Sequence, residues 1–207
     1  MYGILAFGDS ITFGRGVVPS RGWVHRLKKH FETQDFYNIL YNLGVPGDSS
    51  SDLLERFETE IKARAQPSSP DDKFLILIAI GTNDSIGLGS SDDIEKPLKD
   101  YEKKINKMAK IAKEYTDKIV FLGLPPVDES SMPYRDAYFD NKAIEKFNDT
   151  MKDVAEKNDA LFCDIYERFT ENKDYSQFFV DGLHPNDKGY KLMYKAIKEF
   201  LTEKKVI

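Results

Sequence analysis

Short apolar runs alternate along the chain with segments that carry apolar residues at helical spacing. The run 74–80 is apolar without a break, which is typical of a central parallel strand buried on both faces. Five strands are predicted in all, at 4–7, 36–43, 74–80, 118–124 and 160–163. Their alternation with helices predicts an α/β fold, in which helices cover both faces of one five-stranded parallel sheet.

The composition indicates how many domains to expect and argues against some classes of partner. A chain of 207 residues that is 41% hydrophobic and free of internal repeats is expected to form a single domain, residues 1–207. Its formal net charge of -5, with both signs interspersed, argues against nucleic acid as a partner. We find no basic segment leading into an apolar signal stretch, and no run of about 18 apolar residues. A cytoplasmic location without membrane insertion is therefore expected.

The cysteine and two of the histidines are interpreted as structural or surface residues. Cys163 is the only cysteine, so no intrachain disulfide or thiolate zinc site can form, and its apolar run places it in the core. His25 and His30 fall in the helix predicted after Gly22, beside its apolar stripe, and are expected at the surface.

Polar residues and glycines follow several of the predicted strands. Gly8-Asp9-Ser10 follows the first strand, Gly44 the second, and Gly81-Thr82-Asn83-Asp84 the third. A further group, Asp181-Gly182-Leu183-His184-Pro185, precedes the last predicted helix. In open α/β sheets, ligands bind at the carboxyl ends of the strands, so these groups are expected at one edge. Each group taken alone is also ordinary turn material.

Ser10 has the partners that a nucleophilic hydroxyl needs. A serine becomes reactive when a base lies within hydrogen-bond reach and a third group orients that base. His184 is the one histidine outside the early helix, and Asp181 lies three residues before it. A tight loop of that length can set the carboxylate on one imidazole nitrogen while the other faces Ser10. The alternative interpretation of 181–185 is a turn and a helix entry, with about equal weight.

Acyl transfer also needs hydrogen-bond donors for the oxyanion of its tetrahedral intermediate. The Gly44 amide is one candidate, because a glycine turn allows close approach of the substrate. The Asn83 side-chain amide, at the tip of the most apolar strand, is a second candidate, and the backbone N–H of Ser10 is a third.

In their order, spacing and strand context, these four segments resemble the sequence blocks of the SGNH hydrolases, also called GDSL esterases and lipases. The resemblance spans nearly the whole chain and implies a flavodoxin-like three-layer α/β/α fold. It also implies that Ser10 is the nucleophile, His184 the base and Asp181 its orienting acid, with Ser10, Gly44 and Asn83 as the oxyanion hole. The nucleophile elbow of the larger α/β-hydrolase family does not fit, because Thr12 stands at its second glycine.

The expected activity is hydrolysis of a small-molecule carboxylic ester through an acyl-enzyme, without metal or organic cofactor, and with a lean towards acetyl groups. Lysophospholipase and thioesterase activity are alternatives within the family. Further rivals are a non-catalytic binding module and a metal-dependent phosphoesterase, the latter using Asp9, Asp84, Asp181 and His184.

Loop residues are expected to shape the substrate pocket. They are Arg15, Leu88, Tyr134, Phe178 and Phe179. Asp9 is expected to fix the turn beside Ser10 rather than to take part in the chemistry. The sequence assigns no oligomeric state.

Overall fold

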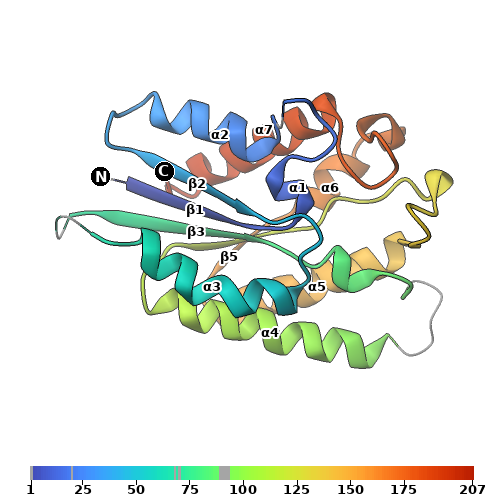
Figure 1. Cartoon of the computed structure of the whole chain (residues 1–207), viewed down its shortest axis with the longest axis horizontal. Coiled ribbons are helices and arrows are strands. Elements are labelled where there is room, and N and C mark those ends of the chain that lie inside the picture. Colours follow the sequence, from blue (N-terminus) through green and yellow to red (C-terminus); the bar gives the residue numbers. More distant parts are fainter. Residues whose placement is uncertain (1, 20, 68, 70, 89–93) are drawn as a thin grey trace.

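The computed structural model describes residues 2–19, 21–67, 69, 71–88 and 94–207. Its centre is a five-stranded parallel sheet in the order β2-β1-β3-β4-β5, which confirms the predicted fold class (Figure 1). This strand order is that of the flavodoxin-like doubly wound folds. The strands are β1 (Tyr2–Gly8), β2 (Ile39–Gly44), β3 (Lys73–Ala79), β4 (Ile119–Leu122) and β5 (Leu161–Cys163).

Helices form a layer on each face of the sheet, with α2, α6 and α7 on one side and α3, α4 and α5 on the other (Figure 1). The helices are α1 (Ser10–Phe13), α2 (Trp23–Glu32), α3 (Ser50–Arg64), α4 (Glu95–Lys113), α5 (Asn141–Lys157), α6 (Ile165–Thr170) and α7 (Asp187–Glu203). Three short 3-10 turns complete the set: η1 (Asn83–Ser85), η2 (Glu129–Ser131) and η3 (Tyr175–Phe178). Among the described residues, no helix is long and apolar enough to cross a membrane.

Polar side chains cap the first turns of α3 and α7, where the strand connections end. Ser49 and Asp52 form a reciprocal capping box at the start of α3, so two of its orphan donors are satisfied. Asn186 accepts the backbone N–H groups of Lys188 and Gly189 at the start of α7. The capping residues thus fix where α3 and α7 leave the sheet edge that carries the polar segments.

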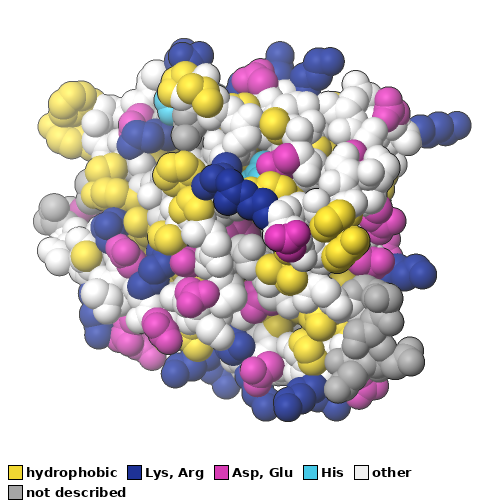
Figure 2. Space-filling view, turned by 45° about the vertical axis from the view of Figure 1, so that its right-hand side comes forward, with side chains coloured by type: hydrophobic (Ala, Val, Ile, Leu, Met, Phe, Trp, Pro, Cys, Tyr) yellow, Lys and Arg dark blue, Asp and Glu magenta, His cyan; other side chains and the backbone are white. Residues whose placement is uncertain are grey.

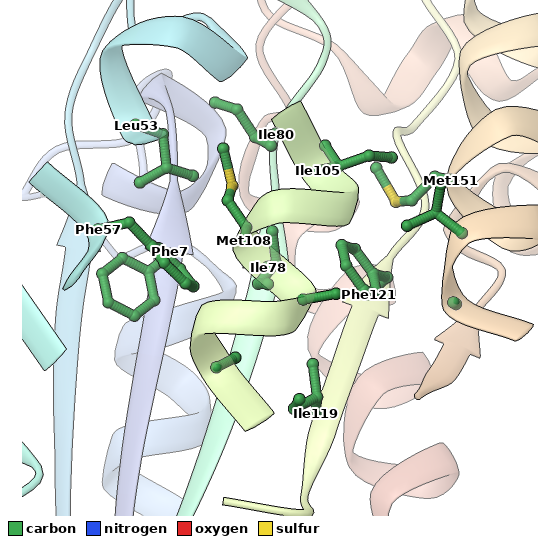
Figure 3. Packing of buried hydrophobic residues seen from close by; sticks show 14 of the residues in the cluster. Phe7, Leu53, Phe57, Ile78, Ile80, Ile105, Met108, Ile119, Phe121 and Met151 are labelled. Atoms are coloured by element: carbon green, nitrogen blue, oxygen red, sulfur yellow. The ribbon is translucent and has the colours of Figure 1, made fainter. Parts of the chain in front are cut away.

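The two faces of the sheet have separate apolar cores. Figure 3 shows the core under α3, α4 and α5, in which Phe7, Ile78 and Phe121 meet Phe57 and Met108. Alternate residues of the same strands face the other core, under α2, α6 and α7. Burial on both faces explains why these strands read as continuous apolar runs rather than as alternating ones.

Cys163 belongs to the core under α7, as predicted. It is 3% exposed, and burial raises the pKa of its thiol to about 12. The thiol is therefore protonated and unreactive at neutral pH.

The start of β2 differs from the prediction. Residues 36–38 form a turn instead of a strand, because Asp35 accepts the Tyr37 backbone N–H on its carboxylate and the Asn38 N–H on its carbonyl. Phe36 is left 91% exposed and the strand begins at Ile39. The predicted fourth and fifth strands are also shortened at their ends.

The two ends of the described chain meet at the edge where the strands begin. Tyr2 Oη and Lys118 Nζ both donate hydrogen bonds to the carbonyl oxygen of Val206. Figure 1 shows both termini on this side, away from α1 and the carboxyl ends of the strands.

Candidate active site

Ser10 stands at the carboxyl end of β1, where the chain passes directly into the short helix α1. Asp9 caps that helix by accepting the Ile11 backbone N–H at 2.8 Å. Ser10 is then the first helical residue, so its own N–H has no intrahelical acceptor. Its side chain is 8% exposed and lines a pocket.

The structure brings the three predicted catalytic residues together. Ser10 Oγ lies 2.9 Å from His184 Nε2, and His184 Nδ1 lies 2.8 Å from Asp181 Oδ2. The other carboxylate oxygen of Asp181 accepts the backbone N–H groups of Leu183 and His184, at 3.1 and 2.7 Å. This pair of backbone bonds makes 181–184 a closed turn, which fixes the carboxylate against the imidazole ring.

The charge on Asp181 is stabilised by that turn. Burial favours its neutral form, but the side-chain and backbone hydrogen bonds from His184 outweigh burial and lower its pKa. Asp181 is therefore ionised near neutral pH. An ionised carboxylate at Nδ1 holds that nitrogen protonated and leaves Nε2 free to accept a proton from Ser10.

Asp9 has the structural role expected of it. It is 2% exposed, and burial raises the pKa of its carboxyl to about 6, against the opposing effect of the Ile11 N–H. Its carboxylate caps α1 and makes no hydrogen bond to Ser10 or His184 in the described part of the chain.

Two of the three expected oxyanion donors face the pocket. Ser10 and Asn83 both line it, and the Ser10 N–H, which has no intrahelical acceptor, has no backbone partner among the described residues either. Asn83 Nδ2 donates one hydrogen to the Asp48 carbonyl oxygen at 2.9 Å, which leaves its second hydrogen available.

The structure argues against Gly44, the remaining expected donor. Its N–H is taken by Asn42 Oδ1 at 3.0 Å, and Gly44 is not among the residues that line the pocket. A Cβ at Gly44 would lie 2.3 Å from Phe13 N and 2.8 Å from Asp9 O. The glycine is thus needed because α1 packs closely over the end of β2, and its amide is already paired with Asn42.

Gly47 occupies the position that Gly44 was expected to hold. It lines the pocket with Ser10 and Asn83, and its N–H has no partner among the described residues. Its φ of +94° is in the left-handed region that favours glycine, and space around its Cβ position is open. The dipeptide Pro46-Gly47 is a turn signal in the sequence, and it marks this position.

The pocket beside Ser10 has a volume of about 280 Å³. Its apolar wall contains Pro46, Ile86, Ala137, Phe139 and Leu183. Arg15 and Tyr134 line it as expected, whereas Leu88, Phe178 and Phe179 pack against the cores instead. Figure 2 shows basic side chains and a histidine together in the middle of this face.

A larger hollow of about 860 Å³ lies elsewhere, where α2 meets α7. It contains His25 and His30, and His30 Nε2 hydrogen-bonds Gln34 rather than a serine. The two histidines are thus outside the site, as predicted.

The four groups of the phosphoesterase alternative do not meet at one point: Asp181 pairs with His184, and Asp9 and Asp84 each have other partners. Asp84 accepts the backbone N–H and the hydroxyl of Ser50, and so ties β3 to the start of α3. Asp9 caps α1, and Asp181 is bound by its own turn. The described residues form no cluster of three or more acidic, histidine or cysteine side chains with metal-binding geometry.

Sequence comparison decides the family. The profile of the GDSL-like lipase/acylhydrolase family matches residues 6–192, which include every segment of the site. The chain belongs to this family. The GDSL family name refers to the segment that here reads Gly8-Asp9-Ser10-Ile11.

Other GDSL proteins share part of the sequence. The chain is 25% identical to the rice (Oryza sativa subsp. japonica) GDSL esterase/lipase WDL1, over 65% of this chain and 56% of that protein. It is 28% identical to the esterase TesA of Pseudomonas aeruginosa, over 59% of this chain and 55% of that protein. The chain thus spans about half the length of the curated relatives it matches.

Solved structures share the fold over almost the whole chain. The lipase/acylhydrolase of Enterococcus faecalis superposes with a TM-score of 0.76 at 23% identity, covering 99% of this chain and 97% of that one. The acetylxylan esterase Axe2 of Geobacillus stearothermophilus gives 0.72 at 21% identity, covering 97% and 93%.

Proposed function

We propose that this GDSL protein is a serine esterase that hydrolyses carboxylic esters through an acyl-enzyme. The observation that carries the proposal is the continuous hydrogen-bonded series from Ser10 Oγ through His184 to Asp181. The proposal treats residues 1–207 as one domain, since the strands form one sheet and helices up to Glu203 pack against it.

In the first step, His184 Nε2 accepts the proton of Ser10 as Oγ attacks the acyl carbon. The imidazolium is stabilised by the ionised Asp181, and it then gives the proton to the departing alcohol oxygen. In the second step, His184 takes a proton from water as the water oxygen attacks the acyl carbon, and the imidazolium then gives that proton to the departing Ser10 Oγ, which releases the acid and restores the enzyme. These steps need no metal or organic cofactor.

The oxyanion is stabilised by donors that are in place before the substrate arrives. We assign the Ser10 N–H, the Asn83 side-chain amide and the Gly47 N–H to this role, the last in place of Gly44. Each such donor contributes roughly a hundredfold to a thousandfold in kcat.

A short acyl group such as acetyl suits the pocket. Its volume of about 280 Å³ must hold the ester and part of the alcohol as well. The same fold in the acetylxylan esterase Axe2 is consistent with acetyl transfer to water. Lysophospholipase and thioesterase activities are the alternatives.

Activity on 4-nitrophenyl acetate tests the proposal. Ser10→Ala is expected to lower kcat by more than about 10⁴-fold with the unfolding midpoint unchanged. Asn83→Ala should lower kcat by roughly a hundredfold or more, with little change in KM. The matched control is Ser51→Ala, a half-buried serine on α3 that should leave kcat unchanged. Hydrolysis by folded Ser10→Ala protein at the wild-type rate would overturn the assignment.

Acyl length and metal dependence separate the alternatives. On 4-nitrophenyl esters from acetate to decanoate, kcat/KM should fall steadily with chain length, whereas a lysophospholipase would favour the long chains. A chelator should leave the rate unchanged and a serine-directed phosphonate should abolish it. The opposite pair of results would favour the metal-dependent phosphoesterase.

A further inference from the structure

The charged side chains that line the catalytic pocket are unlike those of the chain as a whole. The chain has 35 acidic and 30 basic side chains. Among the described residues that line the pocket, however, there is no Asp or Glu, while Arg15 and Arg135 are both present. Neither guanidinium pairs with a carboxylate of the described chain, whereas Arg26, Arg56, Arg64 and Arg168 each form such a pair.

Arg135 is held on the side of the pocket where His184 lies. Its guanidinium is 5.7 Å from the centre of the Tyr134 ring. That ring in turn meets the His184 imidazole edge to face, with centroids 5.3 Å apart. A two-residue hairpin, closed by reciprocal backbone hydrogen bonds between Tyr134 and Ala137 at 2.9 Å, keeps Arg135 in place.

Arg15 approaches His184 from a different segment of the chain. Its backbone is fixed at both ends, because its N–H donates to the Ser10 carbonyl oxygen at 2.9 Å and its own carbonyl accepts Tyr190 Oη at 2.6 Å. The next residue, Gly16, passes so close that a Cβ there would lie 3.3 Å from His184 Cβ. Both arginines therefore flank the histidine.

His184 marks the side on which the alcohol leaves, because in the proposed mechanism it protonates the alcohol oxygen. A guanidinium presents its donors as a planar fork that fits a carboxylate, sulfate or phosphate. Two unpaired guanidiniums beside the leaving group thus form a site for an anion carried by the alcohol.

We propose that the natural substrate is the ester of a short carboxylic acid with an alcohol that bears an anionic group. This rests on the proposed esterase function. Hydrolysis breaks the bond between the acyl carbon and the alcohol oxygen, water supplies the hydroxyl of the acid, and its remaining proton goes to the alcohol. The anionic group is bound by Arg15 and Arg135 and is released intact.

Matched aryl acetates test this specificity. The neutral probe is 4-acetoxybenzamide, and the anionic probes are 4-acetoxybenzoate, 4-acetoxybenzenesulfonate and 4-acetoxyphenyl phosphate. Each kcat/KM is divided by the rate of hydroxide hydrolysis of the same ester, which corrects for the leaving group. At about 20 mM salt the wild-type enzyme should favour an anionic probe about tenfold or more, and added salt should reduce this preference. The best anionic probe identifies the group.

Variants then locate the preference. Arg15→Gln and Arg135→Gln should each lower the anionic-to-neutral ratio about threefold, as expected for charge pairs at a solvent-exposed rim. The double variant should show a ratio near one. The control is Arg21→Gln, an exposed arginine that lines the hollow at α2 instead and should leave the ratio unchanged. Thermal unfolding checks that each variant is folded.

The two proposals fail in different ways. A wild-type anionic-to-neutral ratio of one or less, or a ratio that neither arginine variant changes, would overturn the proposal of an anionic alcohol. Ser10-dependent hydrolysis of the neutral probe would then still support the esterase. Loss of Ser10 dependence on every probe overturns the esterase itself.

Discussion

Asp9 follows β1 directly and is buried beside Ser10, the proposed nucleophile, where it caps α1 without joining the hydrogen bonds of the Ser10 side chain. Burial raises its pKa from 3.8 to about 6. Between those pH values the folded protein keeps a proton that the unfolded chain has released. Raising the pH through this window therefore lowers the free energy of unfolding, by about 3 kcal/mol for a shift of about two units.

Asp9→Asn should remove this pH dependence. An asparagine oxygen accepts the same Ile11 N–H and carries no charge that burial can disfavour. Relative to the wild type, the variant should gain stability as the pH rises from about 4 to 6, and keep that gain at pH 8. Urea unfolding at these three pH values measures the difference, and a difference that is equal at pH 4 and pH 8 would contradict the interpretation.

The proposed oxyanion donors show which functional groups a sequence can reveal and which it cannot. The identities of Ser10, Asn83, Asp181 and His184 follow from chemistry, because a nucleophile, an amide, an acid and a base are recognisable by type. A backbone N–H carries no such mark. Gly44 and Gly47 both lie in the segment after the second strand, and although Pro46-Gly47 is a turn signal, only the packing of α1 over β2 shows which amide is open to the pocket.

At the scale of elements, the hairpin 134–137 has an unusual turn. Its two central residues, Arg135 and Asp136, have φ values of +46° and +68°, as a type I′ turn requires. Glycine or asparagine is the usual choice in such a turn, and a side chain such as arginine is strained there. The strained turn follows Tyr134, whose ring packs edge to face against His184, the proposed catalytic base.

Substitutions at Asp136 should separate the effect of the turn from that of its charge. Asp136→Val places a β-branched residue at positive φ and should lower the free energy of unfolding by about 1–2 kcal/mol. Asp136→Gly, which removes the same charge, should be as stable as the wild type or slightly more stable. Chemical unfolding of both variants provides the measurement. Equal destabilisation by valine and glycine would show that the carboxylate, and not the backbone, determines stability.

Strands and helices could be predicted from the sequence where the burial of apolar side chains determines them. The run 74–80 is buried on both faces and became β3 within one residue at each end. Phe36 and Tyr37 are as apolar as strand residues, but the side chain of Asp35 forms a turn that competes with pairing to β1. The pattern of apolar residues along the chain does not reveal such local hydrogen bonds between a side chain and the backbone.

At the scale of the molecule, the proposed catalytic residues are supported by two different parts of the structure. Ser10 is attached to β1, which lies between the two main cores. The turn that carries His184 is seated on a small separate cluster of Val127, Phe139 and Leu183. A backbone hydrogen bond of 2.8 Å from Asp128 N to Gly182 O completes that seat.

Heating should therefore abolish activity before it unfolds the sheet, because the small cluster buries far less apolar surface than the main cores. The temperature at which turnover is lost should lie below the midpoint seen by far-ultraviolet circular dichroism, and activity should return on cooling. Leu183→Ala should lower the temperature at which turnover is lost and leave the circular dichroism midpoint unchanged, so that the two temperatures lie further apart. If the two temperatures coincide in both proteins, the seat of His184 does not open independently.

The meeting of the chain ends at Val206 decides how this protein can be tethered. Because both ends of this chain lie where the strands begin, a fusion partner or a solid support joined at either end lies at the opposite edge of the sheet from the pocket (Figure 1). The pocket then faces outward in both orientations. The same proximity lets a short linker close the ends into a circular permutant, whose new termini can be opened in any exposed turn away from the pocket.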